Sequence, residues 1–173
     1  MGNSYNFMSL TDIGCHEDIP ETQPTIEGNA IQKAQYVLDN YGKDCFSEDT
    51  GLLIDALDGR PGVYSARYAG DHKNSEDNMD KVLEELGDNT NRSARFKTVI
   101  ALVLDGQTHT FEGVVEGKIL NARQGDGGFG YDPVFLPTGY DKSFAQMTAD
   151  EKSEISHRAR AMRKLHEFLK NLA

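Results

Sequence analysis

The 173-residue chain is long enough to bury a substantial hydrophobic core, and we expect it to form one domain. Its formal net charge of −10 argues against a broad electrostatic grip on nucleic acid, so an anionic ligand would need local Lys or Arg side chains or a divalent cation. No apolar run approaches the roughly 20 residues that span a bilayer, and the two cysteines lack CxxC spacing, which fits a reduced, cytoplasmic setting.

The N-terminal part is polar and irregular, with a candidate short strand at Phe7–Leu10 and an extended loop marked by two prolines. Residues 29–41 are expected to form a helix, because apolar residues recur there at helical spacing until Gly42. Two short strands are expected next, at 45–47 and 52–57, with the polar stretch Glu48–Gly51 between them. A loop or short helix follows at 63–69.

The second half begins with a helix from Ser75 to Leu86, ended by Gly87. A long strand at 94–104, the turn signal Asp105-Gly106 and a partner strand at 108–120 predict a β-hairpin. A short strand is expected at 134–136. A Thr148–Glu151 capping box then opens a helical region whose expected core stripe is Ile155, Ala159, Met162, Leu165 and Leu169. This order of elements indicates an α/β or α+β fold with a mixed sheet.

A glycine-rich stretch at 125–133 is a candidate binding loop. Glycine allows close approach of the backbone to a ligand, and the neighbouring aromatic rings offer faces on which a base could stack. Asp132 could accept hydrogen bonds from a base edge. The alternative is a tight turn between two strands with ordinary core aromatics.

Asp49 and Glu21 are the leading acidic candidates. Asp49 directly follows an expected strand, and a carboxylate at a strand end is well placed to bind Mg²⁺, a hard cation that prefers oxygen ligands. The alternatives are a turn carboxylate for Asp49 and a solvated loop acid for Glu21.

The basic candidates include Lys33, Lys152, His157 and Arg158. Lys152 and His157 are five residues apart, so a straight helix would not place them on one face. We hypothesise that Ser156 caps a second helix after a break, which would turn both side chains toward one pocket. The alternative for His157 and Arg158 is an exposed pair on a helix.

Taken together, these segments resemble the inosine triphosphate pyrophosphatase family, the XTP/dITP diphosphatases. No phosphate-loop, HExxH, GxSxG or paired-cysteine signature competes with it. The matching segments occur in the family's order: Glu-Gly-Asn-Ala-Ile-Gln-Lys-Ala (27–34), Ser-Glu-Asp-Thr-Gly-Leu (47–52), Pro-Gly-Val-Tyr-Ser-Ala-Arg-Tyr-Ala-Gly (61–70), Ala-Arg-Phe-Lys-Thr (94–98), Gly-Gly-Phe-Gly-Tyr-Asp-Pro-Val-Phe (127–135) and Ser-His-Arg-Ala-Arg-Ala (156–161).

The resemblance implies a single α/β domain over residues 1–173, elongated and two-lobed around a long mixed sheet, and a cytoplasmic homodimer. It implies Mg²⁺-dependent hydrolysis of ITP, dITP and XTP to the monophosphate and pyrophosphate, which cleanses the nucleotide pool. By position, Asp49 matches the metal-binding carboxylate and general base, and Glu21 matches a second metal ligand. The substrate contacts implied are Lys33, Thr50, Phe129, Gly130, Tyr131, Asp132, Lys152, His157 and Arg158.

The chain departs from the family pattern at its start. The family's opening strand, its Asn-x-x-Lys phosphate loop and the following helix have no counterpart, and Asn3 has no lysine three residues later. Such a gap would expose unpaired sheet edges. We therefore expect reduced triphosphate hydrolysis by this chain. The alternatives are a catalytically impaired nucleotide-binding domain and a Maf-like nucleotide pyrophosphatase.

Overall fold

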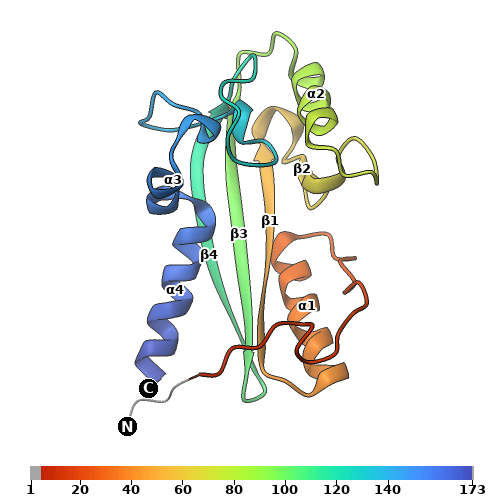
Figure 1. Ribbon diagram of the computed structural model, residues 1–173. Helices are drawn as coiled ribbons and strands as arrows, with labels where there is room; N and C mark the ends of the chain where they lie inside the picture. The colour runs from red at the N-terminus through yellow and green to blue at the C-terminus, as the bar shows by residue number, and fades with distance from the viewer. Residues whose placement is uncertain (1–4, 173) are drawn as a thin grey trace.

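The computed structural model describes residues 5–172. A five-stranded sheet in the order β2-β1-β3-β4-β5 runs along the length of the elongated molecule (Figure 1). Its strands are β1 (Cys45–Ile54), β2 (Pro61–Gly62), β3 (Ser93–Leu104), β4 (Gln107–Ile119) and β5 (Phe135–Pro137). The helices are α1 (Ile26–Tyr41), α2 (Ser75–Leu86), α3 (Ala149–Ile155) and α4 (His157–Leu172), with 3-10 turns at Asp55–Leu57, Ser65–Arg67, Asp132–Val134 and Phe144–Gln146.

The sheet lies between α1 on one face and α4 on the other over its lower half, as Figure 1 shows. Side-chain alternation along β3 produces these two layers. Val99, Ala101 and Val103 pack with α1, whereas Ile100 and Leu102 pack with Ala161 and Leu165 of α4. A third cluster in the upper lobe joins α2 to the upper ends of β1, β3 and β4.

The α/β class and the elongated two-lobed shape are confirmed, but the expectation of a mixed sheet is wrong for the described residues. Every strand pairing among them is antiparallel. The helix between β1 and β3 does not cross over the sheet. Instead, α2 packs in the upper lobe, so the chain returns along β3 in the opposite direction.

Several expected elements are confirmed with shifted ends. Thr25 caps α1 and Gly42 ends it in a left-handed conformation at φ 62°. The hairpin of β3 and β4 and the Thr148–Glu151 capping box are present. Asn74 rather than Ser75 caps α2.

Three expectations are wrong. Phe7–Leu10 is not a strand, and Leu10 begins a turn instead. The two expected strands around Glu48–Gly51 form the single strand β1. Met162 is exposed, and Ala161 instead packs with Leu165 against the sheet. The expected absence of a phosphate loop near Asn3 lies outside the described residues.

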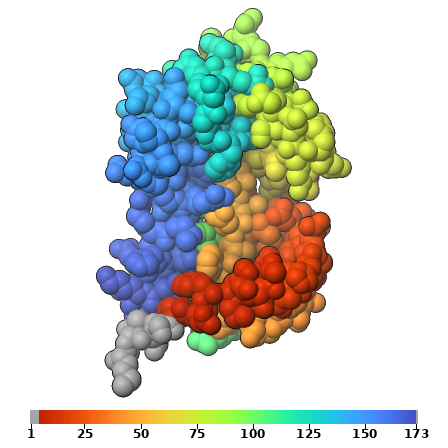
Figure 2. All heavy atoms as spheres, in the orientation of Figure 1, coloured from red at the N-terminus to blue at the C-terminus, as the bar shows by residue number. Residues whose placement is uncertain are grey.

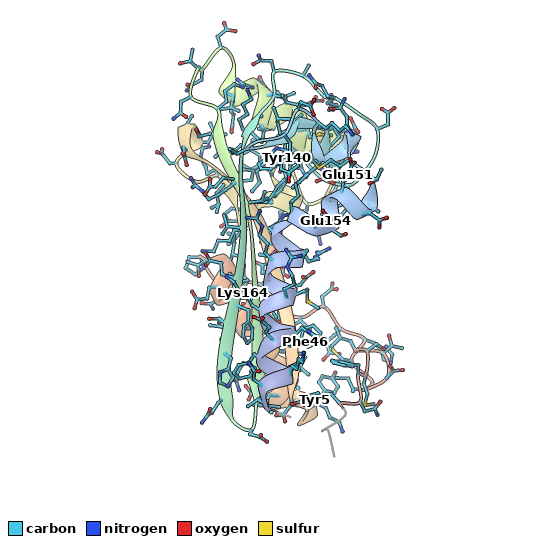
Figure 3. All side chains as sticks on the ribbon, turned by 90° about the vertical axis from the view of Figure 1, so that its left-hand side faces the viewer. Tyr5, Phe46, Tyr140, Glu151, Glu154 and Lys164 are labelled. Carbon is cyan, nitrogen blue, oxygen red and sulfur yellow. The ribbon has the colours of Figure 1, made fainter. Side chains whose placement is uncertain are left out.

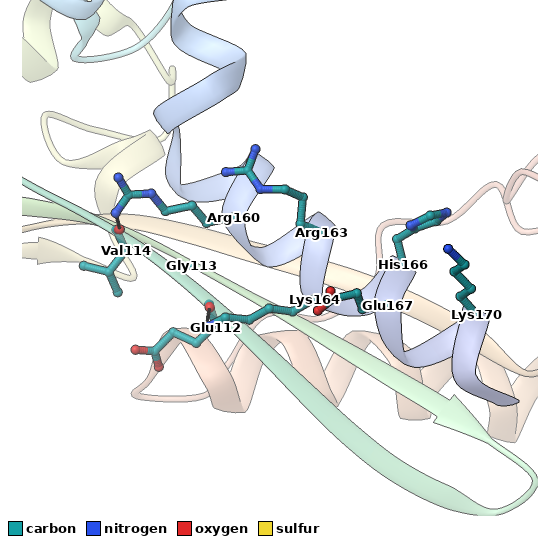
Figure 4. Close-up of a pocket in the computed structure, with 9 residues that line it drawn as sticks. All are labelled: Glu112, Gly113, Val114, Arg160, Arg163, Lys164, His166, Glu167 and Lys170. Carbon is teal, nitrogen blue, oxygen red and sulfur yellow. Dashed lines mark hydrogen bonds between the residues drawn. The ribbon is translucent and has the colours of Figure 1, made fainter.

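The outer edge of β4 is covered by side chains rather than by a strand. β5 pairs only with Gly117–Ile119, which leaves the rest of this edge without a strand partner among residues 5–172. Lys164 of α4 donates to the Glu112 carbonyl at 2.6 Å, and Arg160 donates to the Val114 carbonyl at 2.7 Å (Figure 4). Cationic side chains therefore occupy carbonyls that would otherwise be open to another strand.

The aromatic residues Tyr5 and Phe46 lie near one end of the molecule, away from Tyr140, Glu151 and Glu154 in the other lobe (Figure 3). Across the described part of the chain, no helix combines the length and apolarity needed to cross a membrane.

Candidate functional site

Strand β1 presents candidate residues on both of its faces. Because side chains alternate along a strand, Asp49 points toward α1, while Glu48 and Thr50 point toward the opposite face. The outer side of β1 is paired with β2 only at Leu52 and Leu53, so the described structure leaves its edge open beside Asp49. A ligand that crosses this edge could contact residues of both faces.

Lys33 of α1 connects the acidic residues on the first face. Its Nζ lies 2.6 Å from Glu21 Oε1 and 3.5 Å from Asp49 Oδ1, and it donates to the Glu48 carbonyl at 2.6 Å. Lys33 is therefore not the solvated helix lysine that its sequence context alone suggests. Its charge offsets the repulsion between the two carboxylates.

The Asp49 side chain is only 13% exposed, and its Oδ2 is buried without a hydrogen-bond partner among the described residues. Burial raises the pKa of this carboxyl, Lys33 opposes that effect, and Glu21 adds to it. A buried carboxylate oxygen that lacks a donor suits a cation or a water molecule. Residues 5–172 contain no cluster of three metal-ligating side chains, so Glu21 and Asp49 would share a cation with waters and ligand oxygens.

The glycine-rich loop forms the wall on the other side of β1. Gly128 has φ +71°, and a Cβ there would meet Asp132 Oδ2 at 2.2 Å, so this position requires glycine. The buried Asp132 carboxylate accepts from the Phe129 N–H at 2.9 Å and pairs with Lys152. The buried Asp132 carboxylate thus fixes the backbone of the loop. The Phe129 side chain remains 65% exposed.

Cations flank the exposed Phe129 ring. Lys152 Nζ lies 4.3 Å from the ring centroid, and the Arg158 guanidinium carbon lies 5.9 Å from it. Arg158 also pairs with Glu48 through Nη2 at 2.6 Å. One face of an aromatic ring and two charged donors therefore lie close together at the surface.

The hypothesised break between two helices is confirmed at Ser156, whose φ of −62° and ψ of 151° are extended. Its hydroxyl accepts from the Ala159 N–H at 3.1 Å and so caps the first turn of α4. The break places Lys152, in the last turn of α3, over the Phe129 ring, and places His157, at the start of α4, in the lining of the adjacent pocket. A continuous helix would have separated them.

Gly113 of β4 allows α4 to start directly on the sheet. A Cβ at this position would meet the His157 carbonyl oxygen at 1.9 Å and the Ala161 nitrogen at 2.6 Å. Both are backbone atoms, which cannot rotate away as a side chain can. The absence of a side chain at Gly113 therefore sets how deeply His157 lies in the molecule.

His157 is buried and stacked on Phe96, with ring centroids 4.8 Å apart and an interplanar angle of 16°. Burial lowers the pKa of its imidazole to about 3, and the positive charges of Lys152 and Arg158 act in the same direction. The ring is therefore neutral at neutral pH. Its Nδ1 is buried and has no hydrogen-bond partner among the described residues.

These residues surround a pocket of about 320 Å³ between β1, the glycine-rich loop and the start of α4. Figure 2 shows this face hollowed where β1, in orange, lies between the yellow segment and the red N-terminal part. The expected site residues that line the pocket are Thr50, Phe129, Gly130, Tyr131, Asp132, His157 and Arg158. Lys152 contacts this wall through Phe129, whereas Lys33, Glu21 and Asp49 form a separate group across the β1 edge.

The pocket also contains residues that were not singled out from the sequence. Ser65 accepts from the Leu52 N–H at 2.9 Å, and its own carbonyl accepts from the Tyr131 hydroxyl at 2.6 Å. Asn78, buried in α2, donates to the Ala66 carbonyl at 3.0 Å. Ser65 and Ala66 belong to the matching segment 61–70, which was the one available signal for them. Asn78 looks like an ordinary polar helix residue, and only the folded contacts reveal its position.

The sequence model of the Ham1 family matches residues 2–168. A dITP/XTP pyrophosphatase of Flavobacterium psychrophilum is 57% identical over 168 residues, covering 97% of this chain and 88% of that protein. The Bacillus subtilis dITP/XTP pyrophosphatase is 48% identical, covering 95% and 85%. The solved structure of the Staphylococcus aureus Ham1 protein matches with a TM-score of 0.94 at 39% identity, covering 98% of this chain and 88% of that one.

Proposed function

The chain belongs to the Ham1 family, and from that premise we propose that it hydrolyses non-canonical purine nucleoside triphosphates to the monophosphate and pyrophosphate. The observation that carries the proposal is the arrangement around the open edge of β1. A base-sized pocket lies on one side, and a lysine-linked pair of carboxylates lies on the other. A nucleotide whose base enters the pocket would extend its phosphates across the edge toward Asp49. The Maf-like alternative and the purely nucleotide-binding alternative are not favoured by these relatives.

The base pocket suits a purine that carries a keto group. The Phe129 face offers a stacking surface, and Arg158 and the backbone N–H groups of the glycine-rich loop are donors without acceptor capacity. The 6-keto oxygen of hypoxanthine or xanthine can accept from such donors. The 6-amino group of adenine would leave them unpaired, which costs binding energy and rejects ATP.

Glu21 and Asp49 would hold the divalent cation that we propose, Mg²⁺, because hard carboxylate oxygens are its preferred protein ligands. When bound, this cation would supply charge neutralisation for the phosphates. Asp49 Oδ2, for which residues 5–172 supply no hydrogen-bond donor, would accept the proton of an attacking water. Lys33 Nζ holds the Glu21 and Asp49 carboxylates together and offers positive charge to the phosphate chain.

The decisive experiment is a pyrophosphate-release panel with ITP, dITP, XTP, ATP and GTP, with and without Mg²⁺. We expect release from ITP, dITP and XTP, none from ATP, and release only with the cation, because adenine alone among these bases lacks the 6-keto oxygen. Asp49→Asn should reduce release by at least a factor of about 100, the lower range for loss of a general base. Equal turnover of ATP and ITP would overturn the proposed substrate class, and an active Asp49→Asn protein would overturn the role of Asp49.

Assembly and location extend this proposal. We expect a homodimer in the cytoplasm, acting on a small nucleotide and not on nucleic acid. The net charge of −10 is consistent with the last point. Sedimentation equilibrium of the purified chain tests the oligomeric state.

A further inference from the structure

Glu21 lies in a segment without regular secondary structure, so its position depends on side-chain contacts. Residues 15–24 pass along α1 between the buried Cys15 and the capping residue Thr25. Near the start of this loop, the Glu17 carboxylate accepts from the hydroxyls of Tyr36 at 2.9 Å and Tyr41 at 2.6 Å. At its end, the Gln23 N–H donates to Asn29 Oδ1 at 2.9 Å. Neither contact holds the backbone immediately beside Glu21.

Gln32 holds that part of the backbone. Its Oε1 accepts from the Thr22 N–H at 2.8 Å, and its Nε2 donates to the Thr22 hydroxyl oxygen at 2.8 Å. The amide thus makes two hydrogen bonds to the residue that follows Glu21. Gln32 also directly precedes Lys33, so the same turn of α1 contacts both the Glu21 carboxylate and the adjacent backbone.

A bound cation would affect the Lys33–Glu21 ion pair and the Gln32–Thr22 hydrogen bonds differently. A cation bound by Glu21 competes with Lys33 for the same carboxylate oxygens. The Gln32–Thr22 pair uses no carboxylate oxygen and therefore persists. After the Lys33–Glu21 ion pair is weakened, the Gln32–Thr22 hydrogen bonds become the contact that keeps Glu21 beside Asp49.

We propose that Gln32 is a positioning residue that sets the affinity of the Glu21–Asp49 pair for a divalent cation. The proposal rests on the proposed function to the extent that these two carboxylates hold the cation. Residues that orient ligands without touching the metal typically contribute a factor of about 10 to 100 in affinity. We expect Gln32 to act at the lower end of this range, because Glu17 and Asn29 still attach the loop to α1.

The test measures Mn²⁺ binding by the purified chain without nucleotide, from the free Mn²⁺ signal in electron paramagnetic resonance. Gln32→Ala should raise the dissociation constant for Mn²⁺ by about tenfold. The matched control is Gln35→Ala, since Gln35 lies on the same helix and makes an exposed bond to Asp39 at 2.7 Å. This control should stay within about twofold of the unmodified chain. Thr22→Val, which removes the hydroxyl but keeps the N–H, should give an intermediate loss, and Thr22→Ser should restore the affinity.

The thermal unfolding midpoint of each variant, compared with that of the unmodified chain, shows whether the substitution has impaired folding. The proposal is overturned if Gln32→Ala and Gln35→Ala bind Mn²⁺ equally while both remain folded, or if the unmodified chain binds no Mn²⁺. Pyrophosphate release from ITP is measured in parallel. If the unmodified chain releases no pyrophosphate while Gln32→Ala still weakens Mn²⁺ binding, the proposed function is refuted and the positioning role is supported. If the unmodified chain releases pyrophosphate while Gln32→Ala leaves Mn²⁺ binding unchanged, the function is supported and the positioning role is refuted.

Discussion

His157 illustrates how a single buried residue gains its properties from its neighbours. Its ring lies against Phe96, and cations stand on either side of it in the sequence at Lys152 and Arg158. Desolvation and like charge both penalise the imidazolium form. The pocket therefore holds a neutral imidazole beside fixed positive charges. A neutral ring can make a directional hydrogen bond to a base without adding a further charge that would have to be desolvated.

The depressed pKa of His157 predicts a loss of stability in mild acid. The folded-state pKa is about 3, below the ordinary value of 6.5, so the unfolded chain binds the proton more readily. The stability is fully present above pH 6.5 and is lost as the pH falls from 6.5 toward 3. Between pH 6 and pH 4.5, we expect the free energy of unfolding to fall by about 1.4 kcal/mol per pH unit more than in His157→Phe, which keeps a ring against Phe96. Urea denaturation across this range measures the difference, and parallel pH profiles would contradict it.

At the scale of elements, β1 shows what could and could not be predicted from the sequence. The helix α1 and the β3–β4 hairpin were predictable because their apolar spacing and turn residues agree with the final structure. The stretch Glu48–Gly51 looks like a loop because it is polar, yet it continues the strand. Its polarity reflects the site, since Asp49 and Glu48 make ion pairs across the two faces. Local rules fail most often where function requires polar residues in an otherwise apolar element.

The candidate site was predictable to a similar, limited extent. The break at Ser156 could be hypothesised because Lys152 and His157 share no face of a straight helix. The close packing of α4 on Gly113 could not be predicted, because the sequence does not show which segment packs against a glycine in a strand. Long-range contacts such as those of Asn78 with Ala66 also leave no periodic signal.

Gly113→Ala tests how α4 is seated on the sheet. The new methyl group would clash with the His157 carbonyl, so α4 must shift or the strand must distort. We expect the free energy of unfolding to fall by about 1 to 3 kcal/mol or more, as for other overpacked sites. The KM for ITP should rise, because His157 and Arg158 move with the start of α4. Thr110→Ala, an exposed change on the same strand, should alter stability by no more than about 0.5 kcal/mol. A Gly113→Ala protein as stable and active as Thr110→Ala would refute this account.

At the scale of the whole molecule, long strands connect the hydrophobic clusters. The α1 cluster and the α4 cluster both contain residues of β3, and the upper cluster adds Ala94 and Phe96 from the same strand. Because β3 contributes residues to all three clusters of the described chain, loss of packing in one cluster would disturb the strand on which the other two depend. We therefore propose that the two lobes form one folding unit rather than separate domains.

This architecture predicts a single cooperative unfolding transition. We expect urea midpoints from far-ultraviolet circular dichroism and from tyrosine fluorescence to coincide, since the chain has seven tyrosines and no tryptophan. The dichroism signal reports on helices of both lobes. Two separated transitions, or midpoints that differ between the probes, would show that the lobes unfold independently.

The covered edge of β4 has a consequence during protein synthesis. Translation makes β4 before α4, so the hairpin is synthesised before Arg160 and Lys164, whose side chains occupy its carbonyls in the folded chain. In that interval, neighbouring nascent chains on one messenger could pair through these edges. Slow elongation between the codons for β4 and α4 would prolong the exposure. The yield of native protein should therefore depend on the pace of translation through the segment that joins these two elements.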